Sequence, residues 1–424
     1  MLDINLIRSN PKFIQDNISR RIKYDISKVD GLLKLDDKWR ELKGKSDSLR
    51  YERNKLTLEI TKLSKEKKDI TSLVKKARGI PDEIKNTEEE MDLLRTKINS
   101  ILFYLPNLLH KSVPNGSDAS QNKTLRKVGK ISKLKFDLKN HSELVENLGL
   151  ADFEQGRKVS GQGFNYIQGD LALLDLALQR FGIEFLLKKK FIPVIPPMML
   201  NKETLKGVVD MEAFSEVIYK IENEDLHMIG TAEHSLVSMM KDKTITDLPL
   251  RVCAVTPCFR KEIGAHGVDT KGLFRMHQFN KVEQVVFCKP EDSFKILEDM
   301  QSITESFFKK LGIPFRVIEI CSGDLGGKFA KQYDIEAWFP RQKAYKEVTS
   351  AGNCTDYQAR RLNIKYLNDK NEKQFVHILN NTMVATSRAM VAILENYQKK
   401  DGTIKVPTVL VSYMNGRKII GGKQ

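Results

Sequence analysis

An apolar repeat with alternating three- and four-residue spacing, between Leu32 and Ile101, constrains the fold of this chain more than any other feature. The first series has ten positions, eight of them apolar: Leu32, Leu35, Trp39, Leu42, Ser46, Leu49, Arg53, Leu56, Ile60 and Leu63. The second has nine positions, again with eight apolar: Leu73, Ala77, Ile80, Ile84, Thr87, Met91, Leu94, Ile98 and Ile101. Such a sustained repeat is typical of a coiled coil. Because the two series are out of phase across polar residues 64–72, we expect an antiparallel hairpin of two helices, each roughly 50 Å long at ~1.5 Å per residue. Pro81 should bend the second helix.

The turn of this hairpin is strongly basic. Residues 61–78 contain seven cations against Glu66 and Asp69: Lys62, Lys65, Lys67, Lys68, Lys75, Lys76 and Arg78. Residues 1–150 hold 32 basic and 22 acidic residues, which is +10 of the chain's net charge of +16. Two interpretations remain open at this point: an arm that lies along a nucleic-acid backbone, or a dimerisation coiled coil with a lysine-rich face.

The chain length and composition predict two domains. A chain of 424 residues exceeds what one hydrophobic core usually supports. A polar stretch with Pro106, Pro114 and Gly116 indicates a linker. We therefore expect a helical arm domain at residues 1–103, a linker leading into the next domain at 104–165, and a second domain at 166–424.

Several classes of protein are excluded or disfavoured by the same data. No apolar run approaches the roughly 18 residues of a membrane span, and a hydrophobic content of 41% argues against global disorder. The N-terminus lacks the features of a secretory signal or presequence. The five cysteines do not form a disulfide framework, so we expect a cytoplasmic protein. Cys253 and Cys258 have no Cys/His pair nearby, so we expect buried thiols and no structural zinc.

The second domain mixes helices with short strands joined by hairpins, which favours an α+β fold with an antiparallel sheet. A helix at about 171–190 leads into the extended segment 191–197, and an apolar helix is expected at about 383–397. Strands are expected at 251–262, 273–287, 314–321, 332–338 and 345–350. Neither a GxGxxG nor a GxxxxGK[ST] motif follows a strand, so Rossmann and P-loop folds have no support.

A charged hairpin between residues 258 and 283 is the most informative segment. Side chains alternate faces along a strand, so one face of the second strand should carry Arg275, His277, Phe279, Lys281 and Glu283. Arg260 and Glu262 should share a face of the partner strand. Guanidinium groups around an aromatic ring suit a polyphosphate attached to a base. The alternative is an exposed sheet face with alternating charges.

Arg388 is the one basic residue between Lys373 and Lys399, inside an apolar helix. A lone arginine in such a helix needs a partner. Two interpretations are open, a structural ion pair or a contact with a phosphate.

These segments together resemble class II aminoacyl-tRNA synthetases, and the seryl-tRNA synthetase family in particular. Residues 191–197 are similar to motif 1, FRKE…RMHQFNKVEQ to motif 2, and LNNTMVATSRAMVAILENYQ to motif 3. Thr231-Ala232-Glu233 resembles the family's serine-site triplet. With the helical arm, the resemblance extends over essentially the full chain, and motif 3 is archaeal or eukaryotic-like. It implies an α+β fold: a class II antiparallel-sheet catalytic domain at 166–424, preceded by a tRNA-binding coiled-coil hairpin.

The resemblance also implies roles for individual residues. Arg260 and Arg388 would be catalytic, holding the α- and γ-phosphates of ATP. The ATP site would comprise Arg260, Lys261, Glu262, Arg275, Met276, Phe279 (stacked on adenine), Glu347, Val348, Thr349, Ser350 and Arg388. Glu347 and Ser350 would hold Mg²⁺ with the ATP. Serine would be bound by Thr231, Ala232, Glu233, Arg260, Glu283, Asn380 and Thr382. The tRNA would be bound by Lys62, Lys65, Lys67, Lys68, Lys75, Lys76 and Arg78.

The implied activity is that of a serine–tRNA ligase, which forms seryl-adenylate from L-serine and ATP and transfers serine to the 3′ end of tRNA(Ser). A selenocysteine tRNA is a second candidate acceptor, and motif 1 implies a homodimer. Two alternatives are a non-catalytic RNA-binding paralogue, which the retained charged residues disfavour, and a serine:carrier-protein ligase, which the basic arm disfavours. One departure is visible: residues 350–353 are Ser-Ala-Gly-Asn where the family commonly has Ser-Cys-Ser-Asn.

Overall fold

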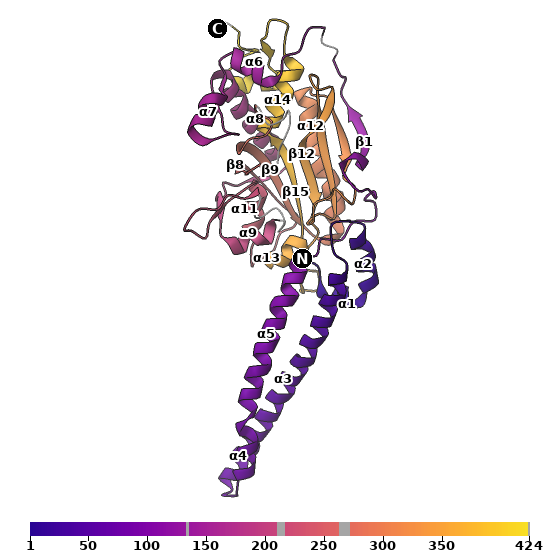
Figure 1. Ribbon diagram of the computed structural model, residues 1–424, viewed down its shortest axis with the longest axis vertical. Coiled ribbons are helices and arrows are strands. Elements are labelled where there is room, and N and C mark those ends of the chain that lie inside the picture. The colour runs from indigo at the N-terminus through magenta and orange to yellow at the C-terminus, as the bar shows by residue number, and fades with distance from the viewer. Residues whose placement is uncertain (133–134, 210–216, 263–271, 423–424) are drawn as a thin grey trace. The chain divides into compact units, whose positions relative to one another are not determined.

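The computed structural model describes residues 1–132, 135–209, 217–262 and 272–422. The chain forms two compact units, Met1–Pro106 and Asn107–Gln424, and each is described by itself (Figure 1). The first unit ends three residues beyond the predicted arm domain. Within the segment predicted as a linker, residues 123–128 form an edge strand of the main sheet of the second unit. The exact domain boundaries stay a prediction.

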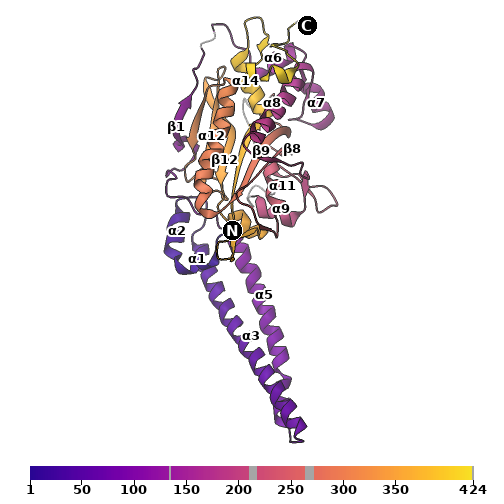
Figure 2. The ribbon, with the colours of Figure 1, turned by 180° about the vertical axis from the view of Figure 1, so that it is seen from behind.

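The N-terminal unit is the predicted antiparallel helical hairpin. Its two long helices, α3 (Ser27–Lys65) and α5 (Ile80–Tyr104), lie side by side in Figures 1 and 2. Two short helices precede them, α1 (Ile4–Ser9) and α2 (Pro11–Ser19). Every residue of the two predicted apolar series is buried or partly buried except Arg53, which is exposed. The periodicity therefore identified the packed face of both helices.

The second helix of the hairpin, which was expected to bend at Pro81, is instead interrupted at Gly79, two residues earlier. Helix α4 (Thr71–Arg78) ends at Gly79, and α5 starts at once with Pro81 in its first turn. Proline lacks a backbone donor and is tolerated at the first helical positions. A glycine followed by a proline thus separates α4 from α5 instead of bending a single helix.

The second unit is built on an eight-stranded sheet, and all neighbouring strands run antiparallel except the parallel edge pair β4–β8. The strand order is β1-β10-β11-β12-β15-β9-β8-β4. Their bounds are β1 Lys123–Val128, β4 Ile192–Pro193, β8 Leu250–Phe259, β9 Gln278–Cys288, β10 Phe315–Glu319, β11 Lys331–Phe339, β12 Ala344–Asn353 and β15 His377–Ala385. The predicted α+β class with an antiparallel sheet is confirmed.

Helices cover this sheet in two groups (Figures 1 and 2). The larger core contains residues of α8 (Gly169–Leu187), α12 (Ser293–Leu311) and α14 (Thr386–Tyr397). A second core contains residues of α9 (Lys202–Val208), α11 (Ala232–Ser238) and α13 (Tyr357–Leu362). None of the helices in the described part of the chain is long and apolar enough to cross a membrane.

The remaining elements are short. The α-helices and strands among them in the described residues are α6 His141–Asn147, α7 Phe153–Ser160, β2 Ala151–Asp152, β3 Tyr166–Ile167, β5 Met199–Leu200, β6 His227–Met228, β7 Thr244–Ile245, β13 Lys365–Leu367, β14 Lys373–Phe375, β16 Ile404–Lys405 and β17 Ile419–Ile420.

The alternation of side chains along β9 decides which face of the sheet carries polar groups. Val282 and Val286 pack in the larger core, whereas Val285 and Phe287 pack in the second core. Glu283 lies between them in sequence and shares the face of Val285. The charged side chains of β9 therefore lie on the face opposite α8 and α12.

One predicted element has a different structure. Residues 383–385 were expected to begin the apolar helix, but they are the end of β15, and α14 starts at Thr386. A short apolar run in a buried strand cannot be told from a buried helix by periodicity alone. This strand matters for the site, because it carries Asn380 and Thr382.

Candidate active site

A cavity of about 420 Å³ lies over the polar face of the sheet, with walls from β9, β12, β15, α11 and α14 and from the segment that follows β8. It brings together nearly all the residues predicted to bind ATP or serine: Thr231, Glu233, Arg260, Glu262, Arg275, Met276, Phe279, Glu283, Glu347, Val348, Thr349, Ser350, Asn380, Thr382 and Arg388. Two predicted residues do not line it. Ala232 is buried at the start of α11, and Lys261 follows Arg260 beyond the cavity wall.

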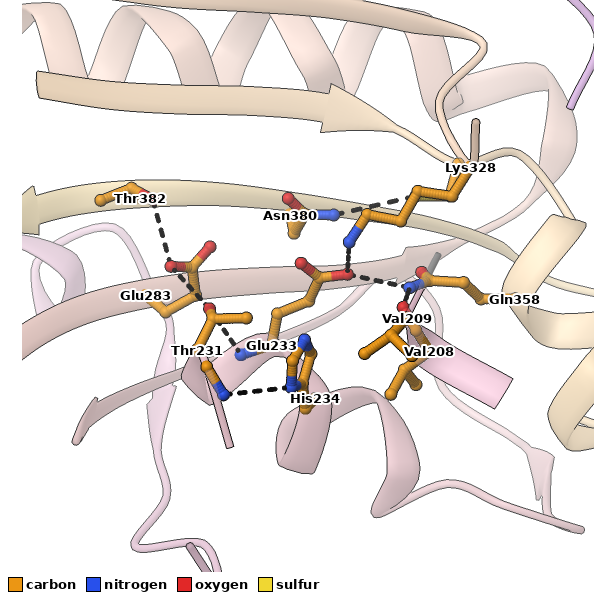
Figure 3. Close-up of polar contacts among 12 residues, drawn as sticks. Val208, Val209, Thr231, Glu233, His234, Glu283, Lys328, Gln358, Asn380 and Thr382 are labelled. Atoms are coloured by element: carbon orange, nitrogen blue, oxygen red, sulfur yellow. Dashed lines mark hydrogen bonds and ion pairs between the residues drawn. The ribbon is translucent and has the colours of Figure 1, made fainter. Parts of the chain in front are cut away.

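Glu233 is a buried carboxylate that lines the cavity, and Figure 3 shows its polar contacts. Its Oε1 accepts from Lys328 Nζ at 2.6 Å and from Gln358 Nε2 at 2.8 Å. Gln358 is held in turn by the carbonyl of Val208, at 3.0 Å. Burial alone would raise the pKa of Glu233, but the Lys328 ammonium and the hydrogen bonds outweigh it and hold that pKa below its usual value. Glu233 is therefore an anion with a fixed orientation.

Glu283 is a second buried carboxylate, and its neighbours are one cation and two hydroxyls. Its Oε2 lies 2.6 Å from Lys281 Nζ and accepts from Thr382 Oγ1 at 3.2 Å and from Thr231 Oγ1 at 3.4 Å. Burial raises the pKa of Glu283 above its usual value, and the Lys281 ammonium opposes that rise. Figure 3 shows Glu283 and Glu233 on neighbouring elements, with Thr231 between them.

His234 fixes the loop between these carboxylates and Arg260. Its Nδ1 accepts from the backbone N–H of Gly230 at 3.4 Å, and Arg260 Nε donates to the carbonyl of Gly230 at 3.1 Å. Burial lowers the pKa of His234 to about 3, so the ring stays neutral. A neutral ring that accepts through Nδ1 carries its proton on Nε2. Both backbone groups of Gly230 are thus engaged, and this orients Arg260.

Arginines and aromatic rings also line the cavity. Arg260 lies 5.4 Å from the centroid of the Phe279 ring, and Arg388 lies 5.2 Å from that of Phe274. Arg388 Nη1 is 3.1 Å from Glu347 Oε1, and it also donates to the carbonyl of Glu347 at 3.1 Å. Arg388 therefore makes the ion pair of the first alternative and also lines the cavity, and its contact with a phosphate stays a prediction.

A β-bulge in β12 places the side-chain oxygens of Glu347 and Ser350 on the same face of the strand. Glu336 pairs with Glu347, Asp334 pairs with Ser350, and one extra residue, Val348, lies in β12 at the register shift. Opposite partners share a face, so the bulge brings Glu347 and Ser350 to the same side although they are three residues apart. Burial and the neighbouring Glu347 raise the pKa of Asp334 to about 8. A carboxylate and a hydroxyl beside a buried acid fit a hard divalent cation that also binds phosphates.

His277 does not line the cavity, contrary to the strict alternation expected from residue 275 onwards. Strand β9 begins at Gln278, so Arg275 and Met276 precede it and both line the cavity. The His277 ring is hydrogen-bonded to Tyr219 and stacks on Phe164 with centroids 5.1 Å apart. The glycine-containing loop at 263–271 lies outside the described residues.

Comparison with known proteins gives a consistent result over the whole chain. Residues 1–109 match the seryl-tRNA synthetase N-terminal domain, and residues 217–397 match the class II tRNA synthetase core domain (G, H, P, S and T). A serine–tRNA ligase from Methanospirillum hungatei is 47% identical over 99% of this chain and 100% of its own length.

Two solved structures are similar over the same extent. The seryl-tRNA synthetase of Pyrococcus horikoshii complexed with ATP is 45% identical, with a TM-score of 0.94 and 99% of both chains covered. The cytoplasmic serine–tRNA ligase of Naegleria fowleri in complex with AMP is 37% identical, with a TM-score of 0.88 and 99% and 98% of the two chains covered. The chain belongs to the seryl-tRNA synthetase family.

The predicted family, fold, enzyme class and ligase activity are thereby confirmed for this seryl-tRNA synthetase family member. Sequence reasoning nevertheless missed part of the cavity wall. It assigned no role to Lys281, which it had placed on the correct strand face, and it did not consider Phe274, His234, Lys328 or Phe329. Only Lys281 had a usable signal, namely its alternation with Phe279 and Glu283. The five cysteines are buried with free thiols.

Proposed function

We propose that this cavity activates L-serine with ATP and that the chain then charges tRNA(Ser). One observation supports this above the others: a single cavity is lined by three arginines and by two buried, hydrogen-bonded carboxylates. Cations suit a triphosphate, and fixed carboxylates with hydroxyls suit the ammonium and hydroxyl groups of a small amino acid.

In the first step, a carboxylate oxygen of serine attacks the α-phosphorus of ATP. The new bond joins that oxygen to phosphorus, and the bond from the α-phosphorus to the bridging oxygen breaks, releasing pyrophosphate. The serine carboxylate is already ionised at neutral pH, so no general base is required. Arg260 would neutralise the α-phosphate and Arg388 the γ-phosphate, and both would act through alignment and charge. In the second step, a hydroxyl of the terminal ribose of tRNA attacks the activated carbonyl and AMP leaves.

Further residues would bind the base and the metal. Phe279 would stack on adenine, with Glu262 and Met276 beside it, and Arg275 is already 3.5 Å from Glu262. Glu347 and Ser350 would hold Mg²⁺ together with phosphate oxygens. The Mg²⁺ would supply additional neutralisation of phosphate charge.

Serine selection would depend on the two carboxylates. Glu233 would receive the α-ammonium group, and Glu283, Thr382 and Asn380 would surround the hydroxyl. Such a site rejects alanine because the buried polar groups would then lack a partner.

The basic end of the hairpin would bind tRNA. All seven predicted cations are exposed, in α3, α4 and the turn between them: Lys62, Lys65, Lys67, Lys68, Lys75, Lys76 and Arg78. Exposed cations on a thin helical arm can follow a phosphate backbone without a binding pocket.

A homodimer through the motif 1 segment also belongs to the proposal. Large apolar side chains are exposed in residues 192–199, which include the edge strand β4, and on α8: Ile192, Ile195, Met198, Met199, Leu176 and Leu187, of which Ile195 is 98% exposed. Apolar residues on an edge strand suit burial against a second copy. Replacing Ile195 with Asp should shift the sedimentation of the protein to that of a monomer. Cytoplasmic location and charging of tRNA(Sec) stay predictions.

The direct test is ATP–pyrophosphate exchange measured with each of the twenty amino acids. Serine should be the only strong responder, because only its ammonium and hydroxyl groups satisfy both carboxylates. Exchange with another amino acid at the level of serine would contradict the proposed specificity, and no exchange at all would contradict the proposed activity.

A further inference from the structure

Lys328 and Phe329, in a loop at residues 326–330, line the cavity beside Glu233, and neither the motifs nor the family resemblance assigned this loop a role. Its backbone is anchored from outside the cavity. The side-chain amide of Asn107 donates to the carbonyls of Lys328 and Cys354 at 3.0 and 2.8 Å. The N–H of Ala330 donates to the carbonyl of Asn353 at 2.8 Å. The loop is therefore tied to the end of β12.

The ring of Phe329 occupies space that only a glycine at position 352 leaves open. A Cβ atom at Gly352 would lie 2.2 Å from two ring carbons of Phe329. Distances under about 3 Å between non-bonded carbon atoms do not occur without a shift of one partner. The glycine at position 352, where the family commonly has serine, therefore leaves the space that the Phe329 ring occupies. Serine at position 352 and this position of the ring exclude each other.

The Phe329 ring in turn packs against the ammonium end of the Lys328 side chain. The ammonium of Lys328 lies 4.9 Å from the centroid of the Phe329 ring and 2.6 Å from Glu233 Oε1. The Lys328 side chain is only 15% exposed. A short ion pair between a buried lysine and a buried carboxylate, supported by a ring, has little freedom to reorient.

The two oxygens of Glu233 are used differently. Both hydrogen bonds to its carboxylate, from Lys328 and Gln358, end on Oε1. Among the described residues no hydrogen bond to Oε2 is present, and Glu233 lines the cavity. One oxygen is therefore committed to the protein, and the other faces the space where a substrate would bind.

We propose that Lys328, seated by Phe329 in the space left by Gly352, is a positioning residue that holds Glu233 Oε1 and directs Oε2 to the ammonium group of the amino-acid substrate. This inference rests on the proposed function, in which the cavity binds serine. Lys328 acts through Glu233 and does not itself contact the substrate. Without it, a buried carboxylate would lose its compensating cation and its fixed orientation.

The test compares Lys328→Met with Lys331→Met in serine-dependent pyrophosphate exchange. Lys331 is a matched control: it lies three residues away, its side chain is 12% exposed, and it pairs with Glu319 at 3.3 Å outside the cavity. In Lys328→Met we expect the KM for serine to rise about 10- to 100-fold, while the KM for ATP changes less than twofold. Lys331→Met should leave both constants within twofold of the wild type.

A second readout separates positioning from a general loss of structure. 3-Hydroxypropionate lacks the amino group, so its inhibition constant against serine should be the same for wild type and Lys328→Met. An unchanged KM for serine, or an equal weakening of serine and 3-hydroxypropionate, would overturn the proposal. If Lys328→Met does not accumulate as folded protein, Lys328→Gln, which keeps a hydrogen-bond donor to Oε1, replaces it. Its KM for serine should rise by a smaller factor, while its inhibition constant for 3-hydroxypropionate stays at the wild-type value.

A third variant tests the link through Phe329. Gly352→Ser and Phe329→Ala should each raise the KM for serine, and the double variant should be no weaker than the weaker single variant, because both changes remove the same seat for Lys328. If the fold-change in the KM for serine of the double variant equalled the product of the two single fold-changes, Phe329 and Gly352 would not be coupled. Failure of the proposed function looks different, because the wild type itself would then lack serine-dependent exchange.

Discussion

The two units of this chain use charge in opposite ways. At the tip of the helical arm, lysines are exposed and surrounded by solvent. In the catalytic unit the charges that matter are few and buried, and they are paired, as in Lys281–Glu283 and Lys328–Glu233. An exposed charge contributes little by itself and is screened by salt. Removing one partner of a buried pair leaves an uncompensated charge and costs far more.

This contrast predicts that single substitutions in the catalytic unit act strongly and locally, whereas the arm responds to the sum of its charges. It also predicts that the two units can be perturbed independently. The chain offers a convenient probe, because its two tryptophans, Trp39 and Trp338, lie one in each unit. The variant Trp39→Phe reports on the catalytic unit alone, and Trp338→Phe reports on the arm alone.

The largest effect is expected from the cavity arginines. Arg260→Ala or Arg388→Ala should lower the rate of pyrophosphate exchange about 10³-fold. Each arginine would stabilise negative charge on the phosphates in the transition state, and losing one such group from an enclosed site typically lowers the rate by that factor. Arg341→Ala, which removes an exposed arginine of the same unit, should leave exchange unchanged. If both cavity variants retained normal exchange, the assignment of these arginines to the phosphates would be wrong.

The next effect is a dependence of stability on pH that belongs to His234. Its pKa falls from an ordinary 6.5 to about 3 on folding, so the unfolded chain binds the proton first. The stability is therefore complete above about pH 6.5 and is lost as pH falls toward 3, with a slope of up to about 1.4 kcal/mol per pH unit. Glu233, Lys328, Lys281 and Arg260 are the charged groups that face this ring.

His234→Asn should flatten this acid loss. The free energy of unfolding would be measured in urea between pH 6.5 and 4.5, in the Trp39→Phe background. Asp334, whose pKa is raised to about 8, also contributes to the slope in this window, but it is common to the variant and its parent, so its contribution cancels in the comparison. The other histidines are common to both proteins and cancel. Parallel pH profiles for the variant and its parent would exclude His234 as the source.

A smaller and purely local effect is expected in the arm. Leu56 packs with Ile80 and Ile84 in the apolar cluster between α3 and α5. Leu56→Ala should lower the stability of the arm by about 2–3 kcal/mol, because apolar burial is reduced and a residual cavity remains. Unfolding followed through Trp39 should shift to lower urea, while pyrophosphate exchange stays at the wild-type rate. Loss of exchange would show that the two units are not independent.

The parts of the molecule that the sequence predicted are those with a visible period. The seam of the hairpin repeats every three or four residues, and the polar face of β9 alternates, so both were recognised without contacts between distant segments. The hidden parts depend on such contacts. Lys328 acquires its partner Glu233 from a segment 95 residues away, and Phe329 fits only because Gly352 is small. The bulge at Val348 is likewise a property of two paired strands, and nothing in β12 alone indicates it.

The smallest effect per residue, and the sharpest test of the contrast, comes from the arm lysines. Replacing Lys67, Lys68, Lys75 and Lys76 together with Gln should weaken tRNA binding roughly tenfold at moderate salt and leave pyrophosphate exchange unaltered. For each phosphate that the arm no longer neutralises, the slope of log affinity against log salt should fall by about 0.7 to 0.9. Titrating tRNA at several salt concentrations measures this slope, and replacing the exposed Lys399 and Lys400 of the catalytic unit is the control. A single lysine whose replacement alone reproduced the whole effect would mean a specific contact, and the arm would then resemble the catalytic unit in how it uses charge.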